Sequence, residues 1–294
     1  MPFRGKPVAE SKKRIAFQGE TGANSDLACR RVHPDMETLP CRTFEDTFAA
    51  VDSGEADLAL IPIDNSVAGR VADIHHLLPD SGLHIVGEHF QRVEHHLLAV
   101  KGAKLGDLTH VHSHVHALNQ CRNVIQELEL EAVVHVDTAA AARDIAERGE
   151  KQHAAIASDL AGEIYGLACL RANIEDAEHN TTRFLIMSRD EANERPGSGD
   201  LMTSFVFRVR NVPAALYKAL GGFATNGVNM TKLESYLVGG GFIAAQFYAE
   251  VDGHPEDANL ALALEELNFF SHEVRILGVY PANPFRKSMN GNGG

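Results

Sequence analysis

Short apolar segments alternate with amphipathic repeats from residue 14 to about residue 187, which is the pattern of an α/β domain. Helices are expected from near Ser25, after Thr43, over residues 71–78, and after Asp137 or Thr138, the last of them ending at Gly149. Strands are expected at residues 14–18, 39–42, 58–63, 83–86, 95–100, 132–136, 154–157 and 182–187.

One further helix has the clearest periodicity in the chain. Apolar residues keep a 3.6-residue period over three turns from Ala117 to Leu128. This pattern predicts a single continuous helix with Asn119 and Gln120 near its first turn.

A second region begins after a polar segment. Residues 188–200 read SRDEANERPGSGD, a composition typical of linkers, and we assign the linker to residues 189–201. Beyond it the pattern is strand, helix, two strands, helix and strand, with Gly239-Gly240-Gly241 as a hairpin turn. This βαββαβ order is ferredoxin-like. Residues 1–13 and 288–294 are expected to be flexible tails.

The excess of acidic residues limits the kinds of molecule that the chain can bind. Lys and Arg total 27 against 40 for Asp and Glu, so a net charge of −13 argues against nucleic-acid or anionic-membrane binding. An anionic substrate would need lysine or arginine side chains gathered at its site.

The 4 cysteines form no C-x-x-C pair, and no apolar segment approaches the ~20 residues of a membrane span. A cytoplasmic protein with reduced thiols is expected.

Four histidines alternate at positions 110, 112, 114 and 116. On a strand they would face one way and hold zinc or nickel, whereas in a loop entering a helix they would point apart. We favour the loop and expect no metal, because no carboxylate-rich surroundings accompany the run.

Three turns have the composition of anion sites. Gly19, Gly22 and Ser25 lie between a strand and a helix, where backbone N–H groups bind anions, although the dinucleotide fingerprint is absent. Residues 63–70 form a second such turn, and residues 180–184 a third, at the start of the last strand. Taken alone, the glycine turn is more often an ordinary tight turn, and residues 180–184 are equally consistent with a hydrated strand edge.

Together, these motifs match one family in order and spacing. The segments IAFQGETGANS (15–25), IPIDNSVAGRVADIHHLL (61–78), SHVHALNQC (113–121), NTTRFLI (180–186) and LESYLVGGGF (233–242) carry the resemblance. From residue 14 to 281 the chain resembles bacterial prephenate dehydratase with a C-terminal ACT regulatory domain.

The resemblance implies an α/β catalytic domain at 14–188, two-lobed and periplasmic-binding-protein type II-like, with its active site between the lobes. Residues 14–90 plus 170–188 would form one lobe and 91–169 the other. The ferredoxin-like βαββαβ ACT domain would span 202–281. The implied partners are the substrate prephenate, the effector phenylalanine and further copies of the chain in a homodimer or homotetramer. No cofactor or metal is implied.

The resemblance also assigns residues. The implied catalytic residues are Thr182, Asn65, Ser66, Ser113 and Gln120. The implied substrate-binding residues are Asp64, Arg183, Phe184, His114, Gly22 and Ser25. The implied phenylalanine-binding residues are Asn211, Val212, Ala214, Ala215, Leu216, Glu234 and Ser235.

Several positions depart from the family pattern. Asp64 replaces a usual Glu, Val115-His116 a usual Pro-Gln, and Asn24 a usual aromatic residue. In the ACT segment, Ala214 stands for a usual glycine and Tyr236-Leu237 for Arg-Pro.

The implied chemistry is loss of carbon dioxide and water from prephenate. Thr182 would donate a hydrogen bond to the departing hydroxyl, and His114 or a water would supply the proton. Arg183 would pair with one carboxylate, and backbone N–H groups of residues 22–25 and 65–66 would hold the other. Three alternatives stay open: an arogenate dehydratase, a non-catalytic amino-acid sensor, and a metal-binding protein using the histidine run.

Overall fold

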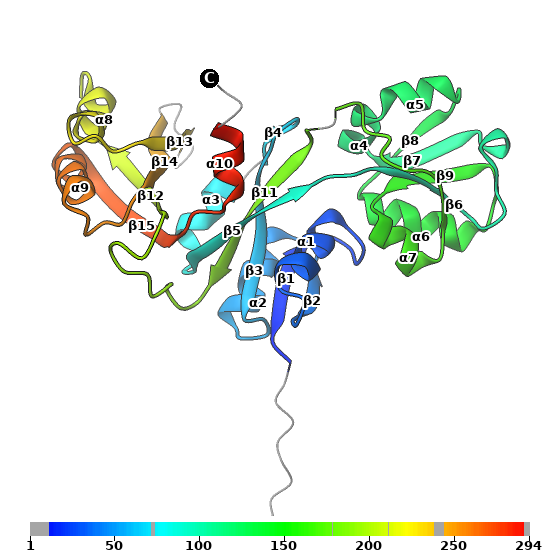
Figure 1. Ribbon diagram of the computed structural model, residues 1–294, viewed down its shortest axis with the longest axis horizontal. Helices are drawn as coiled ribbons and strands as arrows, with labels where there is room; N and C mark the ends of the chain where they lie inside the picture. Colours follow the sequence, from blue (N-terminus) through cyan, green and yellow to red (C-terminus); the bar gives the residue numbers. More distant parts are fainter. Residues whose placement is uncertain (1–11, 72–73, 178, 211, 238–243, 291–294) are drawn as a thin grey trace, which may run out of the picture.

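The computed structural model describes residues 12–71, 74–177, 179–210, 212–237 and 244–290. Three sheets organise these residues, and Figure 1 shows them side by side. We call the central sheet with its helices the first lobe, the sheet at the right of Figure 1 the second lobe, and the sheet at the left the C-terminal unit. Within the described ranges, no helix is long and apolar enough to cross a membrane.

The first lobe has the strand order β2-β1-β3-β11-β5, with β4 beside β3. Strands β1, β2 and β3 are parallel, whereas β11 runs antiparallel to both β3 and β5. The end of β3 and the start of β11 therefore meet at one edge of the sheet. The bounds are β1 Arg14–Gln18, α1 Asn24–Val32, β2 Glu37–Cys41, α2 Phe44–Asp52, β3 Leu58–Asn65, β4 Gly69–Arg70, α3 Ile74–Asp80, β5 His84–Arg92 and β11 Thr181–Ser188.

The second lobe has the order β10-β6-β9-β7-β8. Asp137 caps α6 through its side chain and Gly149 ends that helix in the left-handed conformation, as the sequence predicts. The bounds are β6 His96–Ala99, η1 Leu105–Asp107, β7 His110–His114, α4 Val115–Gln120, α5 Arg122–Glu127, β8 Glu131–His135, α6 Thr138–Arg148, β9 His153–Ala157, α7 Asp159–Tyr165 and β10 Ala168–Arg171.

The C-terminal unit has the antiparallel order β13-β14-β12-β15, so the expected βαββαβ arrangement is found. The glycine turn that we expect between β13 and β14 lies outside the described residues. The bounds are β12 Leu201–Val209, α8 Ala215–Thr225, β13 Met230–Leu237, β14 Ala244–Asp252, α9 Ala258–Phe270, β15 Ser271–Pro281 and α10 Phe285–Asn290.

The first lobe and the C-terminal unit share one hydrophobic core. Ile85 and Leu185 of the first lobe are buried in the same cluster as Val206, Tyr248 and Leu277 of the C-terminal unit. Gly278 has no room for a side chain, because an added Cβ would collide with the carbonyl oxygen of Ile85. The close approach of β15 to β5 thus requires glycine at this position.

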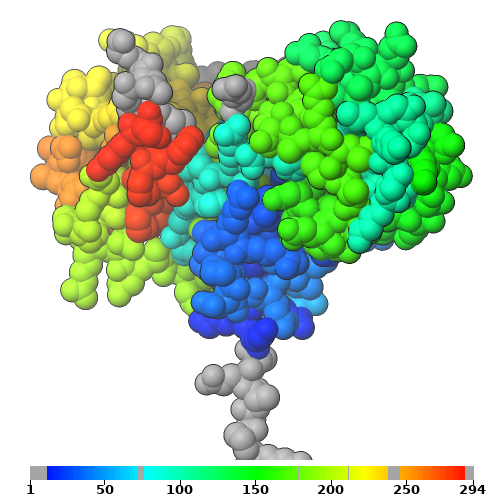
Figure 2. Space-filling view, turned by 45° about the vertical axis from the view of Figure 1, so that its right-hand side comes forward, coloured from blue at the N-terminus to red at the C-terminus, as the bar shows by residue number. Residues whose placement is uncertain are grey.

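Two predictions about secondary structure are wrong. The helix expected over residues 117–128 is interrupted at Cys121, whose φ of −127° and ψ of 30° are not helical. Residues 288–290, expected in a flexible tail, belong to α10, which Figure 2 shows in red on the surface beside the C-terminal unit. Strand β5 is also twice the predicted length, and α7 and β10 were not predicted from the sequence.

Candidate active site

The candidate catalytic residues Thr182 and Asn65 lie opposite each other at the edge where β11 begins and β3 ends. Asn65 Nδ2 donates to Thr182 Oγ1 over 2.9 Å and to Asn180 Oδ1 over 2.8 Å. Asn65 Oδ1 in turn accepts from the backbone N–H groups of Val67 and Ala68. Because the threonine oxygen is the acceptor, its own hydrogen remains available for a ligand.

Gln120 joins this cluster from the second lobe. Its Oε1 accepts from Asn180 Nδ2 over 2.9 Å and lies 2.9 Å from Nε2 of His95. His95 and Asn180 are almost fully buried. The structure therefore brings Thr182, Asn65 and Gln120 into one network, although 117 residues separate Asn65 from Thr182.

A cavity of about 780 Å³ lies between the lobes. Ser25 and Asn24 line it from the first turn of α1, and His114 lines it from the second lobe. Asn24 Oδ1 is buried without a hydrogen-bond partner among the described residues, so a ligand donor can satisfy it. Among the described residues that line the cavity, Arg42 is the one that carries the positive charge of a lysine or arginine side chain.

Three side-chain hydrogen bonds connect the two lobes. Arg143 pairs with Glu20 at 2.6 Å, Ser158 Oγ donates to the carbonyl oxygen of Gly22 at 2.6 Å, and Tyr165 donates to that of Thr21 at 2.8 Å. An added Cβ on Gly22, whose φ is +92°, would lie 3.1 Å from the Ala161 backbone. Gly22 is thus required for the approach of the lobes.

His114 is a titratable side chain that lines the cavity. Burial lowers its pKa, the positive field of His116 lowers it further, and Asp137 opposes the shift. Its Nδ1 accepts from the backbone N–H of His116 at 3.3 Å. A neutral ring accepting at Nδ1 carries its hydrogen on Nε2.

The structure contradicts the expectation that Arg183 binds substrate. Arg183 is 7% exposed, and its guanidinium contacts Glu88 at 2.8 Å, Glu250 at 2.8 Å and the hydroxyl of Tyr280 at 3.2 Å. Its donors are therefore used inside the protein. Phe184 is likewise in the core, 1% exposed. Successive side chains of a strand point to opposite faces, and both faces of β11 are buried: Arg183 lies among the charged groups next to the C-terminal unit, and Phe184 lies in the apolar cluster of Phe17 and Leu60.

Three further expectations need correction. The hydroxyl of Ser113 is buried and donates to the carbonyl oxygen of Ile156 at 2.6 Å, so it supports the second sheet. The N–H of Gly22 donates to Asp26, and the N–H of Ser66 to Thr181, so neither is available to an anion. Ser66 Oγ connects the site loops instead, donating to the carbonyl oxygen of His179 and accepting from Thr181 N–H.

Asp64 is engaged by the C-terminal unit. Lys232 Nζ lies 2.7 Å from its Oδ1, and Arg183 lies 3.7 Å from its Oδ2. A carboxylate paired in this way orients the end of β3 rather than contacting an anionic substrate. No local pattern marks Lys232, His95 or Arg42 as site residues, since each reaches the site only through tertiary contacts.

The residues expected to bind an effector are divided between two places. At the start of α8, Ala215 is buried and Leu216 is half-buried, whereas Val212 and Ala214 in the preceding segment are exposed. Ala214 has φ of 60°, which explains why glycine is usual there. On β13, Ser235 is exposed, whereas Glu234 pairs with Arg70 and Lys232. Asn211 lies outside the described residues.

The histidine run is a strand rather than the expected loop over residues 110–114. His112 Nε2 lies 2.9 Å from His153 Nδ1, and His110 stacks on the same ring. Among the described residues, no three side chains of the metal-binding types are grouped to hold an ion.

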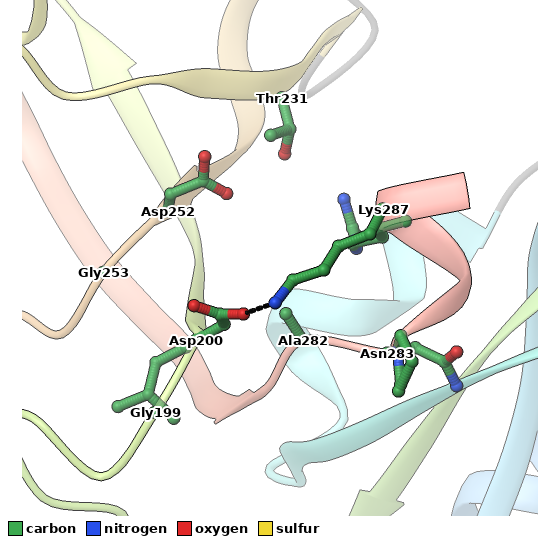
Figure 3. A pocket seen from close by; sticks show the side chains of 11 residues that line it. Gly199, Asp200, Thr231, Asp252, Gly253, Ala282, Asn283 and Lys287 are labelled. Atoms are coloured by element: carbon green, nitrogen blue, oxygen red, sulfur yellow. Dashed lines mark ion pairs between the residues drawn. The ribbon is translucent and has the colours of Figure 1, made fainter. Parts of the chain in front are cut away.

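A different cavity, of about 600 Å³, separates the C-terminal unit from α10. Figure 3 shows Lys287 reaching from α10 to Asp200, 2.5 Å away, with Asp252 and Thr231 beyond. The hydrogen bond to Asp200 raises the pKa of Lys287. We assign the site to the edge between the lobes because the hydrogen-bond network of Thr182, Asn65 and Gln120 lies there.

Comparisons with known proteins point to one family. Residues 15–192 match the family model described as prephenate dehydratase. The chain is 58% identical over 273 residues to a bifunctional N-acyl-homoserine lactone acylase/prephenate dehydratase of Komagataeibacter europaeus, covering 93% of this chain and 97% of that protein. It is 38% identical to arogenate dehydratase/prephenate dehydratase 1 of Arabidopsis thaliana, covering 94% and 74%. The solved structure of prephenate dehydratase in complex with L-Phe from Arthrobacter aurescens has a TM-score of 0.83 at 32% identity, covering 92% and 90%.

Proposed function

The chain belongs to the prephenate dehydratase family, and on that premise we propose that its inter-lobe site converts prephenate to phenylpyruvate, carbon dioxide and water. The observation that carries the proposal is the Asn65–Thr182 hydrogen bond of 2.9 Å, which makes the threonine oxygen an acceptor and leaves its hydrogen for the departing hydroxyl.

The reaction needs positioning more than strong acid–base chemistry. The C–C bond to the ring carboxylate breaks, its electron pair forms the last ring double bond, and the ring C–O bond breaks as hydroxide takes a proton. Thr182 stabilises the negative charge that grows on the departing oxygen, since its hydrogen bond strengthens as the charge develops. A neutral His114 with hydrogen on Nε2 can donate a hydrogen bond to the substrate, whereas the proton itself would come from a water.

The carboxylates of the substrate need positive charge, and Arg183 is not available for them. We propose Arg42 and the start of α1 in its place. Both line the inter-lobe cavity, and no side chain caps the N-terminus of α1. An uncapped helix start favours an anion through its unpaired N–H groups.

The direct test uses purified, EDTA-treated protein mixed separately with prephenate and with arogenate. Phenylpyruvate from prephenate supports the proposal. Phenylalanine formed from arogenate alone would identify the chain as an arogenate dehydratase. If both substrates are returned unchanged, the chain has no dehydratase activity and an amino-acid sensor becomes the better assignment.

We further propose that the C-terminal unit is an ACT regulatory domain that binds phenylalanine and pairs with a second copy of the chain, in a cytoplasmic homodimer or homotetramer. The βαββαβ order and the L-Phe complex of the Arthrobacter aurescens protein support it. Titration of the reaction with phenylalanine to millimolar levels tests it: activity should fall, and a flat response would leave the unit with a role in assembly alone.

A second candidate activity follows from the Komagataeibacter europaeus relative, which is also named an N-acyl-homoserine lactone acylase. Water would cleave the amide to give a fatty acid and homoserine lactone. His114, kept neutral by burial in the cavity, is the candidate general base. Release of homoserine lactone by the wild type, but not by His114→Asn, would support this activity; no release by the wild type would exclude it.

A further inference from the structure

A chain of side-chain hydrogen bonds crosses from the first lobe to the second, and its direction is set at one end. The backbone N–H groups of Val67 and Ala68 can only donate, at 3.0 and 2.7 Å, so the Asn65 atom they meet is the carbonyl oxygen. The amide nitrogen of Asn65 must then face Thr182 and Asn180.

The same logic continues to the second lobe. Asn180 accepts from Asn65 through Oδ1, so its Nδ2 is the atom that meets Gln120, 2.9 Å away. A donor there requires the Gln120 carbonyl oxygen as its partner. His95 Nε2 contacts the same oxygen at 2.9 Å and must carry the ring hydrogen.

Because these groups are buried, reversing an amide or moving the ring hydrogen of His95 would be costly. Asn180 is 1% exposed and His95 is 2% exposed. A reversed amide would set oxygen against oxygen without water to compensate, and an unmatched buried polar group costs more than a hydrogen bond contributes. Burial also lowers the pKa of His95, which keeps the ring neutral, and its Nδ1 has no partner among the described residues.

We propose that Asn180 and His95 are positioning residues that hold Gln120 with its NH₂ group toward the ligand. Both contacts occupy the carbonyl oxygen of Gln120, so neither uses its nitrogen. With the hydroxyl hydrogen of Thr182, the site then presents hydrogen-bond donors from both lobes. Such a site selects a ligand with acceptor oxygens, such as a hydroxylated carboxylate. The role in catalysis rests on the proposed dehydratase function.

The test compares variants that remove a donor with variants that keep it. His95→Leu removes the ring donor, whereas His95→Gln carries an N–H donor of similar reach. Asn180→Asp replaces the donating amide with a carboxylate, and Asn119→Asp adds the same charge at the exposed neighbour of Gln120. We expect kcat/KM for prephenate to fall ~10-fold or more in His95→Leu and Asn180→Asp, and to stay within about 3-fold in the two controls.

A double-mutant cycle separates positioning from loss of structure. In a Gln120→Ala background, His95→Leu and Asn180→Asp should have little further effect, because the group they orient is gone. If His95→Leu or Asn180→Asp lowers kcat/KM by the same factor with Gln120→Ala as without it, the proposal is overturned. A His95→Gln enzyme as slow as His95→Leu would also overturn it. Thermal unfolding of each variant identifies any that fail to fold.

A readout without substrate keeps the proposal testable if the dehydratase function fails. Long-range ¹H–¹⁵N spectra of the histidine-labelled chain report which ring nitrogen of His95 carries hydrogen. We expect Nε2; hydrogen on Nδ1 would refute the orientation of Gln120. A wild type inactive on prephenate but with hydrogen on Nε2 would refute the function and keep the orientation.

Discussion

At the scale of single residues, Thr182 is the side chain on which the proposed reaction depends most. Thr182→Ala removes the donor to the departing oxygen while the strand pairing of β11 remains, so we expect kcat to fall by ~10²-fold or more. Thr182→Ser keeps the hydroxyl and is the matched control. Steady-state formation of phenylpyruvate measures both, and equal kcat for wild type and Thr182→Ala would remove the threonine from the mechanism.

His112 gives a residue-scale prediction about stability. It is 5% exposed, and burial, followed by the positive fields of His153, Arg148, His110 and His135, lowers its pKa to about 4. The unfolded chain takes up this proton near pH 6.5 but the folded chain does not. The free energy of unfolding therefore falls as the pH drops from about 6.5 to about 4, by roughly 2 kcal/mol between pH 7 and 5.

The measurement is urea unfolding of wild type and His112→Asn at pH 7 and pH 5. The variant should lose about 2 kcal/mol less than wild type over this interval, since asparagine takes up no proton. The exposed His116→Asn is the control and should follow wild type. If the free energy of unfolding falls equally in wild type and His112→Asn between pH 7 and pH 5, His112 is not the group whose pKa is lowered in the folded chain.

At the scale of elements, the break between α4 and α5 shows how a loop overrides a periodic pattern. The side chain of Asp176 accepts from the N–H groups of Arg122 and Asn123, and its own N–H donates to the carbonyl oxygen of Gln120. The loop thus caps a new helix where the sequence predicts a continuous one. The break makes Gln120 the last residue of α4, facing the first lobe.

Asp176→Ala removes this cap. We expect the free energy of unfolding to fall by about 1 kcal/mol, the usual cost of a lost N-terminal cap, and kcat/KM to fall with it because the start of α5, which directly follows Gln120, loses its side-chain acceptor. Asp159→Ala, at the start of α7 where Ser158 provides the cap, is the control. Chemical denaturation and steady-state kinetics measure the two effects. An unchanged variant would mean that neither the start of α5 nor the position of Gln120 depends on the Asp176 side chain.

At the scale of the whole molecule, a buried group of four charges joins the first lobe to the C-terminal unit. Glu88 and Arg183 come from the first lobe, Glu250 from β14 and Arg286 from α10, with ion-pair distances between 2.6 and 3.1 Å. Burial alone would raise the pKa of Glu250, but Arg183 overcomes it and lowers that pKa. The strand that carries Thr182 is therefore tied to the C-terminal unit beside the site.

Glu250→Ala leaves Arg183 buried with fewer partners. We expect a loss of about 3–5 kcal/mol in the free energy of unfolding, the usual cost of breaking a buried pair. Glu273→Ala, in an exposed pair with Arg208 at 3.7 Å, should lose less than about 1 kcal/mol. Urea unfolding measures both. A small loss for Glu250→Ala would mean that the two parts do not depend on this cluster.

Much of the fold follows from local patterns in the sequence. The caps Thr43 and Asp137, the stop at Gly149 and the βαββαβ order are all present, because each depends on neighbours a few residues apart. Only the family resemblance assigns Thr182 and Asn65 to one site, since no local rule joins residues so far apart in the chain, and the hydrogen bond between them comes from the structure alone.

What the sequence by itself determined is the set of elements, their order and the residue types available at the ends of strands. Only the tertiary structure decided which polar side chains face the site: it turned Arg183 into the core, joined Lys232 to Asp64 and placed His95 on Gln120. The physical reason is that periodicity and capping act over a few residues, whereas burial and the direction of a hydrogen bond depend on neighbours that folding brings together from distant parts of the chain.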